Sequence, residues 1–465
     1  MSVPRSTVSR NFDPRPAVAG LMMAWAGSNA GAGPLASMPD GDPGETSGLA
    51  TRSAAQRLQP RASLAAPTQA TTVVAVTNCN DSGAGSLRAA VATHAGVIDM
   101  TALACSKISL STGAIIIDHD VFDVALNGPT GHPLAIDGNQ LGRVLVHNGE
   151  GTLTLDHVTL TNGSYLSGYY GGGCIYAFGS VTMQNSTVSN CTLSLGNYAA
   201  LGGGIYARHD LTLNDSVLSS NQALGATGKA RGGGAYVPGN LVVNRSSIRD
   251  NSAFSTGNSA FGGGVYVIGT TQVYAATISG NSSGFAGGMR TLSSAAFSNS
   301  TVSGNSAAVA GGIVVNGSVV VDNSTVAFNT HSSLEFGAGI HALGVVARSS
   351  IIANNTSIAN GHNVDLLCSS CFPSGSHNLI TGSNSDLPDD TIVAEPMLGP
   401  LANNGGPMLT HALLPGSPAL DAGSNIHGYP FDQRGHARVF GFDPDIGAFE
   451  SGTDSIFGDG FEHLD

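Results

Sequence analysis

A seven-residue phrase recurs along the chain at nearly constant spacing, and this repeat limits the folds that the chain can adopt. The phrase reads NSTVSNC at 185–191, NSTVSGN at 299–305 and NSTVAFN at 323–329. Related segments, aligned on their last residue, follow at steps of 30, 30, 30, 24, 24 and 26 residues. These aligned positions, called ladder slots below, are Cys191, Asn221, Asn251, Asn281, Asn305, Asn329 and Asn355. A fixed period of roughly 20–50 residues predicts a solenoid of stacked units.

The alternation of apolar and polar residues inside each repeat favours strands over helices. Segments 211–220 (LTLNDSVLSS) and 241–250 (LVVNRSSIRD) alternate with a period of two, which is typical of half-buried strands. Three residues before each slot stands an apolar side chain: Val188, Leu218, Ile248, Ile278, Val302, Val326 and Ile352. We therefore predict that each repeat is one coil of a parallel β-helix, with strands of successive coils about 4.8 Å apart.

The asparagines at the ladder slots have a structural interpretation. Asparagine tolerates the left-handed backbone of tight turns, and stacked asparagines form a hydrogen-bonded ladder. Asn-Ser-Thr also fits the acceptor sequence for N-glycosylation. We interpret the three copies of the phrase as the same turn in different coils, and the glycosylation sequences as a by-product.

Runs of glycine introduce a second repeated stripe. GGGCIY, GGGIY, GGGAY and GGGVY begin at positions 171, 202, 232 and 262. The apolar residues after the glycines are expected to point inward: Ile175, Ile205, Ala235, Val265, Met289 and Ile313. Neighbouring residues of a strand point to opposite faces. The residues that follow are therefore expected on the outer surface: Tyr176, Tyr206, Tyr236, Tyr266 and Arg290.

Three successive coils each carry about six extra residues at one corner. Eleven residues separate Cys191, Asn221 and Asn251 from the next glycine run, whereas five residues separate Asn305 from its run. Insertions in a solenoid collect on one face, which is often the binding face. One interpretation is a groove with an aromatic floor that stacks sugar rings, and the other is a purely structural tyrosine ladder. The candidate ligand-binding residues are Tyr176, Tyr206, Tyr236, Tyr266, Tyr198, Arg208, Lys229 and Arg231.

The beginning of the chain predicts export. Residues 1–33 combine early arginines, the short apolar stretch VAGLMMAWAG at 18–27 and the small-residue pattern AGA at 30–32, which together indicate a signal peptide. Residues 34–70 are rich in Pro, Gly, Ala and Ser and are predicted to be a disordered linker.

The chain has six cysteines, and in an exported protein these predict disulfides. Sequence proximity favours the pairs Cys79–Cys105, Cys174–Cys191 and Cys368–Cys371 among the pairings that are possible. The spacing CSSC at 368–371 lacks the βαβ context of a redox motif. A loop bridge or two thiols is the preferred interpretation.

Charge and composition exclude several classes of function. The net charge is −13, charged residues make up 11% of the 465 residues, and no cluster of Lys or Arg occurs. A nucleic-acid partner, which needs a basic surface, is therefore not expected. No stretch of 18 apolar residues occurs, so no transmembrane helix is expected.

The repeats and the two ends of the chain resemble known families. Residues 76–100, VTNCNDSGAGSLRAAVATHAGVIDM, resemble the N-terminal cap of secreted β-helix repeat proteins. The GG[IV] and NSTVSGN blocks over residues 71–390 resemble the right-handed parallel β-helix of the pectin lyase-like superfamily and the repeats of polymorphic outer-membrane proteins. Residues 391–450, with LGPLANNGGPMLTHALLPGSPALDAG and DQRGHARVFGFDPDIGAFE, resemble the choice-of-anchor Q domain. Residues 451–465 hold IFGDGFE, which looks like a C-terminal sorting tag.

These resemblances imply an architecture and a location. The expected fold is all-β, a right-handed parallel β-helix with a short helix at 87–95, N-capped by Ser86, and a small C-terminal β cap. The expected location is the exterior or the surface of a bacterial cell. The superfamily hosts both enzymes and adhesins, so the fold alone does not decide the activity.

A search for catalytic residues finds no complete set. The clustered carboxylates of a polygalacturonase and the acidic Ca²⁺ site of a pectate lyase are not evident, so no catalytic residue and no cofactor is predicted, although Ca²⁺ stays possible. A charge-rich set near the C-terminus is interpreted as a salt-bridge network rather than a site: Asp421, Asp432, Arg434, Arg438, Asp445 and Glu450. We predict a non-catalytic adhesin or glycan-binding module. The alternatives are a polysaccharide lyase or hydrolase and a structural spacer.

Overall fold

The computed structural model describes residues 72–118, 123–166, 168, 171–226, 228–257, 259–332, 337–358, 365–369 and 373–452. The predicted signal peptide (1–33), the predicted linker (34–70) and residues 453–465 of the predicted tail lie outside the described residues. Cys371 also lies outside them, and with it the predicted Cys368–Cys371 bridge.

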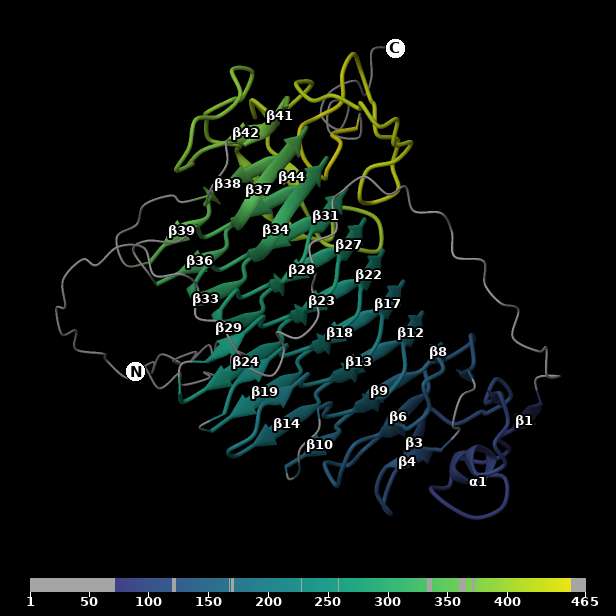
Figure 1. Cartoon of the computed structure of the whole chain (residues 1–465). Coiled ribbons are helices and arrows are strands. Elements are labelled where there is room, and N and C mark those ends of the chain that lie inside the picture. The colour runs from purple at the N-terminus through teal and green to yellow at the C-terminus, as the bar shows by residue number, and fades with distance from the viewer. Residues whose placement is uncertain are drawn as a thin grey trace, which may run out of the picture. The chain divides into compact units, whose positions relative to one another are not determined.

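Three parallel sheets wind around a common core and form the all-β parallel helix that the repeat predicts (Figure 1). From β7 to β39, each coil passes through sheets A, B and C before it returns to sheet A one layer further on, whereas the described coils before β7 and after β39 have strands of sheets A and B only. Sheet A consists of β1 (Val73–Ala75), β2 (Val97–Asp99), β4 (Ile115–Ile117), β5 (Val124–Asn127), β7 (Leu145–His147), β8 (Leu153–Asp156), β11 (Ile175–Ala177), β12 (Val181–Gln184), β16 (Ile205–Ala207), β17 (Leu211–Asn214), β21 (Ala235–Val237), β22 (Leu241–Asn244), β26 (Val265–Val267), β27 (Thr271–Tyr274), β30 (Met289–Thr291), β31 (Ala295–Ser298), β34 (Ile313–Asp322), β37 (Ile340–Arg348), β40 (Leu366–Cys368) and β41 (Ser374–Ser376).

Sheets B and C follow sheet A along the coil. Sheet B consists of β3 (Lys107–Ser109), β6 (Ala135–Asp137), β9 (Thr159–Thr161), β13 (Thr187–Ser189), β18 (Val217–Ser219), β23 (Ser247–Arg249), β28 (Thr277–Ser279), β32 (Thr301–Ser303), β35 (Thr325–Ala327), β38 (Ile351–Ala353) and β42 (Leu379–Ile380). Sheet C consists of β10 (Ser164–Tyr165), β14 (Thr192–Leu195), β15 (Ala200–Leu201), β19 (Gln222–Gly225), β20 (Ala230–Arg231), β24 (Ser252–Ser255), β25 (Ala260–Phe261), β29 (Ser282–Phe285), β33 (Ser306–Val309), β36 (Thr330–His331) and β39 (Thr356–Ser357).

The core is built from columns of identical positions in successive coils. Ile175 pairs with Ile205 in sheet A, and Val188 pairs with Leu218 in sheet B. Both predicted inward columns are buried in one hydrophobic cluster. Removing these apolar side chains from water is the main favourable contribution to folding, at roughly 25 cal/mol per Å².

The asparagines at the ladder slots form the predicted ladder. The side-chain amide of Asn251 donates to Oδ1 of Asn281 at 2.9 Å, and the backbone N–H of Asn251 donates to the same oxygen at 3.0 Å. The same amide also donates to the carbonyl of Leu218 at 2.9 Å. The pattern repeats from Asn221 to Asn355, and all of these asparagines are fully buried.

The left-handed turns lie beside the ladder slots, not on them. Residues with positive φ stand immediately before the slots, such as Asn190, Asp250 and Asn354, and at the first position of the repeated phrase, such as Asn185 and Asn299. The expectation that the slot asparagines themselves adopt this backbone is wrong. Their packing explains why: the slot side chain must point into the coil, so the tight turn falls on the residue before it.

The serine of the repeated phrase forms a second buried ladder. The backbone N–H of Ser300 donates to Oγ of Ser324 at 3.1 Å, and that of Ser324 donates to Oγ of Ser350 at 3.1 Å. The phrase therefore encodes a left-handed turn, a serine ladder and an asparagine ladder. Asn299 and Asn323, which begin two of the glycosylation sequences, are buried.

The asparagine ladder ends at a different kind of residue on each side. At the lower end, the predicted disulfide Cys174–Cys191 is confirmed, with Cys191 at the first ladder slot. At the upper end, Oδ1 of Asp365 accepts the N–H and side-chain amide of Asn355 at 2.7 and 2.9 Å, and Thr381 donates to its Oδ2 at 2.5 Å. Burial raises the pKa of Asp365 to about 6.

The first coil is closed by a short helix. α1 (Leu87–Val91) begins after Ser86, whose hydroxyl accepts the N–H of Ala89 at 3.2 Å and caps the helix as predicted. The helix ends at Val91, four residues before the predicted end. The predicted disulfide Cys79–Cys105 is confirmed next to it. No helix among the described residues has the length and apolarity to cross a bilayer.

The C-terminal segment lies along sheet B rather than only over the last coil. It contains one antiparallel pair, β43 (Leu398–Ala402) and β44 (Thr410–Leu413), and is otherwise irregular. The side chain of Gln433 donates to Thr277 at 2.9 Å and accepts from Thr301 at 2.6 Å. These contacts cover the outer face of β28, β32 and β35, whose residues are all buried.

Five members of the charge-rich set of the C-terminal segment are buried and form a network, as the sequence interpretation holds: Asp432, Arg434, Arg438, Asp445 and Glu450. The sixth, Asp421, is exposed, and its backbone N–H donates to Oδ1 of Asp445 at 2.8 Å. Nε of Arg434 donates to Asp432 at 2.8 Å, and the Glu450 carboxylate accepts the N–H groups of Phe440 and Asp445 at 3.0 Å. Burial raises the pKa of Glu450 to about 7, against the opposing effect of the N–H groups that donate to its carboxylate, and the charge of Asp445 adds to the rise. The network fixes the irregular backbone of this segment.

Candidate functional site

The extra residues of three successive coils form a two-layered extension, called the wing below. It consists of residues 192–201, 222–231 and 252–261. Outgoing strands β14, β19 and β24 form one layer and returning strands β15, β20 and β25 the other, and β29 pairs with both. A small apolar core lies between the layers: Leu193, Leu195, Ala200, Ala223, Ala230, Ala253 and Ala260. The insertions are therefore ordered strands and not surface loops.

The wing covers the tyrosine stripe of sheet A. Tyr236 and Tyr266 are only 4% and 3% exposed, and Tyr176 and Tyr206 are half-buried. The prediction that all four tyrosines lie on the outer surface is therefore wrong. They do point away from the coil core, but the returning layer of the wing packs over them. Phe261, for example, meets the ring of Tyr266 edge-on at 6.4 Å.

The four tyrosine rings stack on one another. Successive centroids are 5.3, 5.7 and 5.5 Å apart from Tyr176 to Tyr266, and neighbouring rings are within 18° of parallel. Arg143 lies 5.3 Å from the ring of Tyr176 at one end, and Arg290 lies 5.9 Å from Tyr266 at the other. Each contact places a guanidinium over a ring face. The arrangement matches the structural-ladder interpretation of the stripe.

The remaining predicted residues are spread over three places. Tyr198 is exposed at the turn between β14 and β15, and Lys229 is half-buried one coil further on, with its carbonyl accepting the N–H of Ala200 at 2.8 Å. Arg231 is buried, with its guanidinium 5.2 Å from the ring of Tyr266.

Arg208 lies away from the wing. It is exposed at the turn between β16 and β17, where its guanidinium lies 3.8 Å above the ring of Phe178. The structure thus brings Tyr198 and Lys229 together at the wing tip and separates Arg208 from them.

The outer face of the wing carries an aromatic side chain that sequence reasoning missed. Phe254 is 58% exposed and pairs with Leu224, which pairs with Ser194 in the coil below. Gln222 and Ser252 form the neighbouring column of the same face. The available signal was the period-two pattern SAFS at 252–255, in which alanine faces the small core and phenylalanine faces outward.

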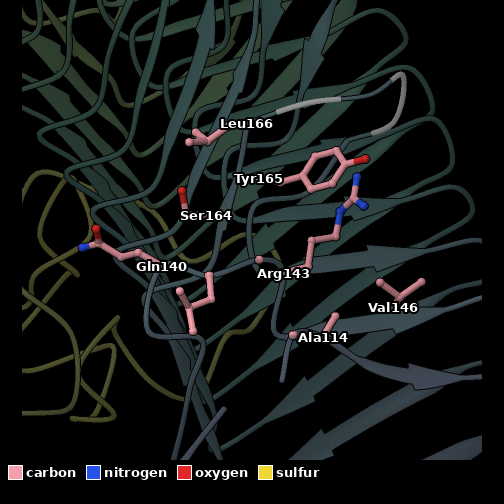
Figure 2. A pocket seen from close by; sticks show the side chains of 10 residues that line it. Ala114, Gln140, Arg143, Val146, Ser164, Tyr165 and Leu166 are labelled. Atoms are coloured by element: carbon pink, nitrogen blue, oxygen red, sulfur yellow. The ribbon is translucent and has the colours of Figure 1, made fainter. Parts of the chain in front are cut away.

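A pocket of about 360 Å³ lies where the wing begins. Figure 2 shows the guanidinium of Arg143 beside the ring of Tyr165, with Leu166 and Gln140 farther along the lining. Arg143 stacks 3.5 Å from the centroid of Tyr165. Its Nε and Nη2 each donate at 2.9 Å to carbonyls of the first glycine run, at Gly172 and Gly171. Burial lowers the pKa of Arg143.

The column of the stripe includes a buried histidine on the far side of the wing. His341 stands two coils beyond Arg290 in the same column, and its Nε2 lies 2.8 Å from Oγ of Ser369. Burial, with the nearby charge of Arg290, lowers the pKa of His341 to about 4. The imidazole is therefore neutral near pH 7 and acts as part of the packing.

The described residues of the wing and of the pocket lining include no carboxyl group. Cleavage of a glycosidic bond uses a pair of carboxyl groups or a base with bound cations. The described lining of the pocket contains no Asp, Glu or His. Within the ranges that the structure describes, no group of three or more His, Cys, Asp or Glu could hold a metal ion.

No protein-family model matches the chain, and no curated protein matches it. Among solved structures, the chain is similar to the crystal structure of pectate lyase Pel9A, with 14% identity and a TM-score of 0.38 over 82% of this chain and 97% of that one. A likeness at this level does not bear on activity. The resemblance of residues 391–450 to a choice-of-anchor Q domain stays a prediction.

Proposed function

We propose that the chain is an exported, non-catalytic adhesin that binds a glycan through the outer face of its wing. The observation that supports the proposal best is Phe254, an aromatic ring that is more than half exposed on the paired strands of the wing. Gln222 and Ser252 flank it with an amide and a hydroxyl, and Tyr198 stands at the tip. Aromatic faces with nearby polar groups suit sugar rings, which present both C–H and O–H surfaces.

The rigidity of this face favours binding. β19 and β24 are held by parallel pairing to their neighbours and by the small core beneath them. A ligand that docks on such a preorganised surface orders few groups of the protein, so less of the interaction energy is lost to entropy. The three wing segments repeat every 30 residues in the sequence, which suits a ligand that is itself a repeating polymer.

Export and attachment complete the proposal. Two confirmed disulfides suit an oxidising exterior. Residues 1–33 would direct export, and residues 391–450 would serve as the C-terminal cap or anchor that their resemblance implies. A polysaccharide lyase or hydrolase is the alternative function, and a structural spacer is the third.

Glycan binding by the full chain tests the proposal. Wild type, Phe254→Ala and Phe442→Ala are applied to an array of immobilised polysaccharides that includes polygalacturonate and alginate. Phe442 is an exposed phenylalanine of the C-terminal segment and serves as the matched control. We expect saturable binding that weakens at least ten-fold in Phe254→Ala and is unchanged in Phe442→Ala.

Two other outcomes would decide against the proposal. If no polysaccharide on the array retains the folded chain, the result favours a structural spacer over a glycan-binding protein. If polygalacturonate or alginate incubated with the chain develops the ultraviolet absorbance of unsaturated uronates, the lyase alternative replaces the adhesin. The lyase assay is run with and without Ca²⁺, because an added cation could complete a site formed with substrate oxygens.

A further inference from the structure

The outer face of sheet C carries one uncharged polar side chain in each of six successive coils (Figure 1). Each of these residues directly follows a ladder slot, and parallel pairing aligns them in a column, called the polar column below. The members are Thr192, Gln222, Ser252, Ser282, Ser306 and Thr330. Since strands of neighbouring coils are about 4.8 Å apart, the column offers polar groups at regular intervals along the axis of the solenoid.

The polar groups of this column are free to bind a ligand. All six residues are exposed or half-buried, and within the described part of the chain their side chains make no hydrogen bond with another protein group. The buried serine ladder differs in this respect. Oγ of Ser300 donates to the carbonyl of Ser298 at 2.7 Å and accepts the N–H of Ala276 at 3.2 Å. The polar column thus has hydrogen-bonding capacity that the fold does not use.

The strands that carry the polar column are uncharged. β14, β19, β24, β29, β33 and β36 contain no Asp, Glu, Lys or Arg. Beside the column, the next outward positions of the wing are Ser194, Leu224 and Phe254. The face that presents Phe254 therefore combines an aromatic ring with hydroxyl and amide groups and has no charged side chain on its strands.

The basic residues of the wing lie on its other layer. Ala230 of the returning strand β20 fills the small apolar core of the wing, and Arg231 lies 5.2 Å from the ring of Tyr266 on sheet A. Since neighbouring residues alternate between the two faces of a strand, Lys229 is on the same side as Arg231. Neither cation is therefore directed toward the outer face.

The charged residues nearest to Ser252 in the sequence balance each other. Arg249 and Asp250 form an ion pair of 2.9 Å at the corner before β24. Carboxylate and sulfate groups of a ligand are held by charge-assisted hydrogen bonds from arginine or lysine, and the outer face offers none. The net charge of −13 also repels polyanions at longer range. Both features disfavour a polymer of uronates or sulfated sugars.

We propose that the ligand of the wing is an uncharged polysaccharide that lies along the solenoid axis over the polar column, with one sugar ring against Phe254. This assignment rests on the proposed function, because it names the class of glycan for the same face. Hydroxyl groups of the sugars donate to and accept from the hydroxyl and amide groups of the column, so no opposite charge is required. The column continues beyond the wing to Ser306 and Thr330, and the ligand therefore also contacts coils without an insertion.

Polymers that differ mainly in charge test the class of ligand. Binding of the full chain is measured on polygalacturonate and its methyl ester, on carboxymethyl and hydroxyethyl cellulose, on galactomannan, alginate and chitosan. We expect at least one uncharged polymer to bind at least ten-fold more tightly than every charged one. Salt screens only interactions between charges, so this affinity should not change between about 0.05 M and about 0.5 M NaCl.

Substitutions in the column test the charge and the position of the ligand. Gln222→Glu and Gln222→Lys introduce opposite charges at one exposed residue. Because either charge loses hydration beneath a neutral sugar, we expect both variants to bind more weakly, by at least three-fold. Ser306→Arg should weaken binding at least ten-fold, whereas Ser318→Arg, at an exposed serine of sheet A, should leave it unchanged. All four sites of change are exposed, so wild-type unfolding midpoints are expected.

Three results would overturn the proposal. One is a charged polymer that binds as tightly as the best uncharged one. Another is opposite effects of Gln222→Glu and Gln222→Lys, which would assign a charged ligand. The third is unchanged binding by Ser306→Arg. If a charged polymer binds and Phe254→Ala abolishes its binding, the adhesin function stands and only this inference fails. If the folded chain binds no polymer, the proposed function fails as well.

Discussion

The asparagine ladder makes a strong quantitative prediction for the substitution Asn281→Ala. Asn281 stands in the middle of the ladder, fully buried, with asparagine slots on both sides. Alanine keeps the backbone and removes only the amide. The 24-residue step begins at this coil, so the substitution also tests whether the ladder holds across the change in coil length.

The expected loss in the free energy of unfolding follows from the hydrogen bonds of the Asn281 side chain. Its Oδ1 accepts the N–H and the amide of Asn251 at 3.0 and 2.9 Å. Its amide donates to the carbonyl of Ile248 and to Oδ1 of Asn305, both at 2.9 Å. These four bonds contribute about 1 kcal/mol each, so we expect a loss of about 4 kcal/mol. Donors of Asn251 left without partners in the dry core would increase it.

Denaturant unfolding of the full chain measures this loss. The control Asn244→Ala removes a half-buried asparagine whose amide donates one bond of 2.9 Å to Asn214 on the outer face, and it should cost about 1 kcal/mol or less. Since solenoids can unfold in parts, hydrogen exchange of the slots at Asn251 and Asn305 is followed as well. A loss below about 1 kcal/mol for Asn281→Ala, or equal losses for both variants, would refute the reasoning.

Three further predictions concern stability. Tyr236→Ala opens a cavity in the covered ring stack and should cost about 3–5 kcal/mol, measured as a shift of the unfolding midpoint, whereas Tyr198→Ala at the exposed tip should stay within about 0.5 kcal/mol. The pKa of Asp365 is about 6 in the folded state, above its usual 3.8, so the folded state binds the proton of this carboxyl more tightly than the unfolded state does. The free energy of unfolding of wild type should therefore fall by about 3 kcal/mol, relative to that of Asp365→Asn, as the pH rises from about 4 to about 6. Unfolding curves at a series of pH values measure this difference. Replacing Cys174 and Cys191 by alanine opens a loop with a sequence separation of 17 and should cost about 3 kcal/mol; an unchanged melting temperature would contradict this.

The coil could be predicted because each position of it repeats. Val188 and Leu218 share a column because the same pattern recurs after 30 residues, and inward and outward positions alternate strictly in a strand. The ladder of Asn221 and its successors followed from the same spacing. These predictions rest on local pattern and on stacking, which the sequence carries directly.

The site could be predicted only in part because burial depends on what folds over a strand. The pattern placed Tyr236 on the outward side of its strand, correctly, but six inserted residues per coil form a second layer that covers it. Phe254 was missed for the same reason, since its exposure depends on Ala253 filling the wing core. The alternating pattern predicts that the side chains of Thr277 and Thr301 point to the outer surface. They are nevertheless buried, because Gln433 from a distant segment lies over them. No local period reports such contacts.

The central claim is that the chain binds a glycan through its wing without cleaving it. Hydrogen–deuterium exchange of the full chain, with and without the polysaccharide that the array retains, tests this most directly. We expect slower exchange in the outgoing wing segments 192–195, 222–225 and 252–255, with the polymer recovered at its original length. Protection confined to other coils, or shortening of the polymer, would contradict it.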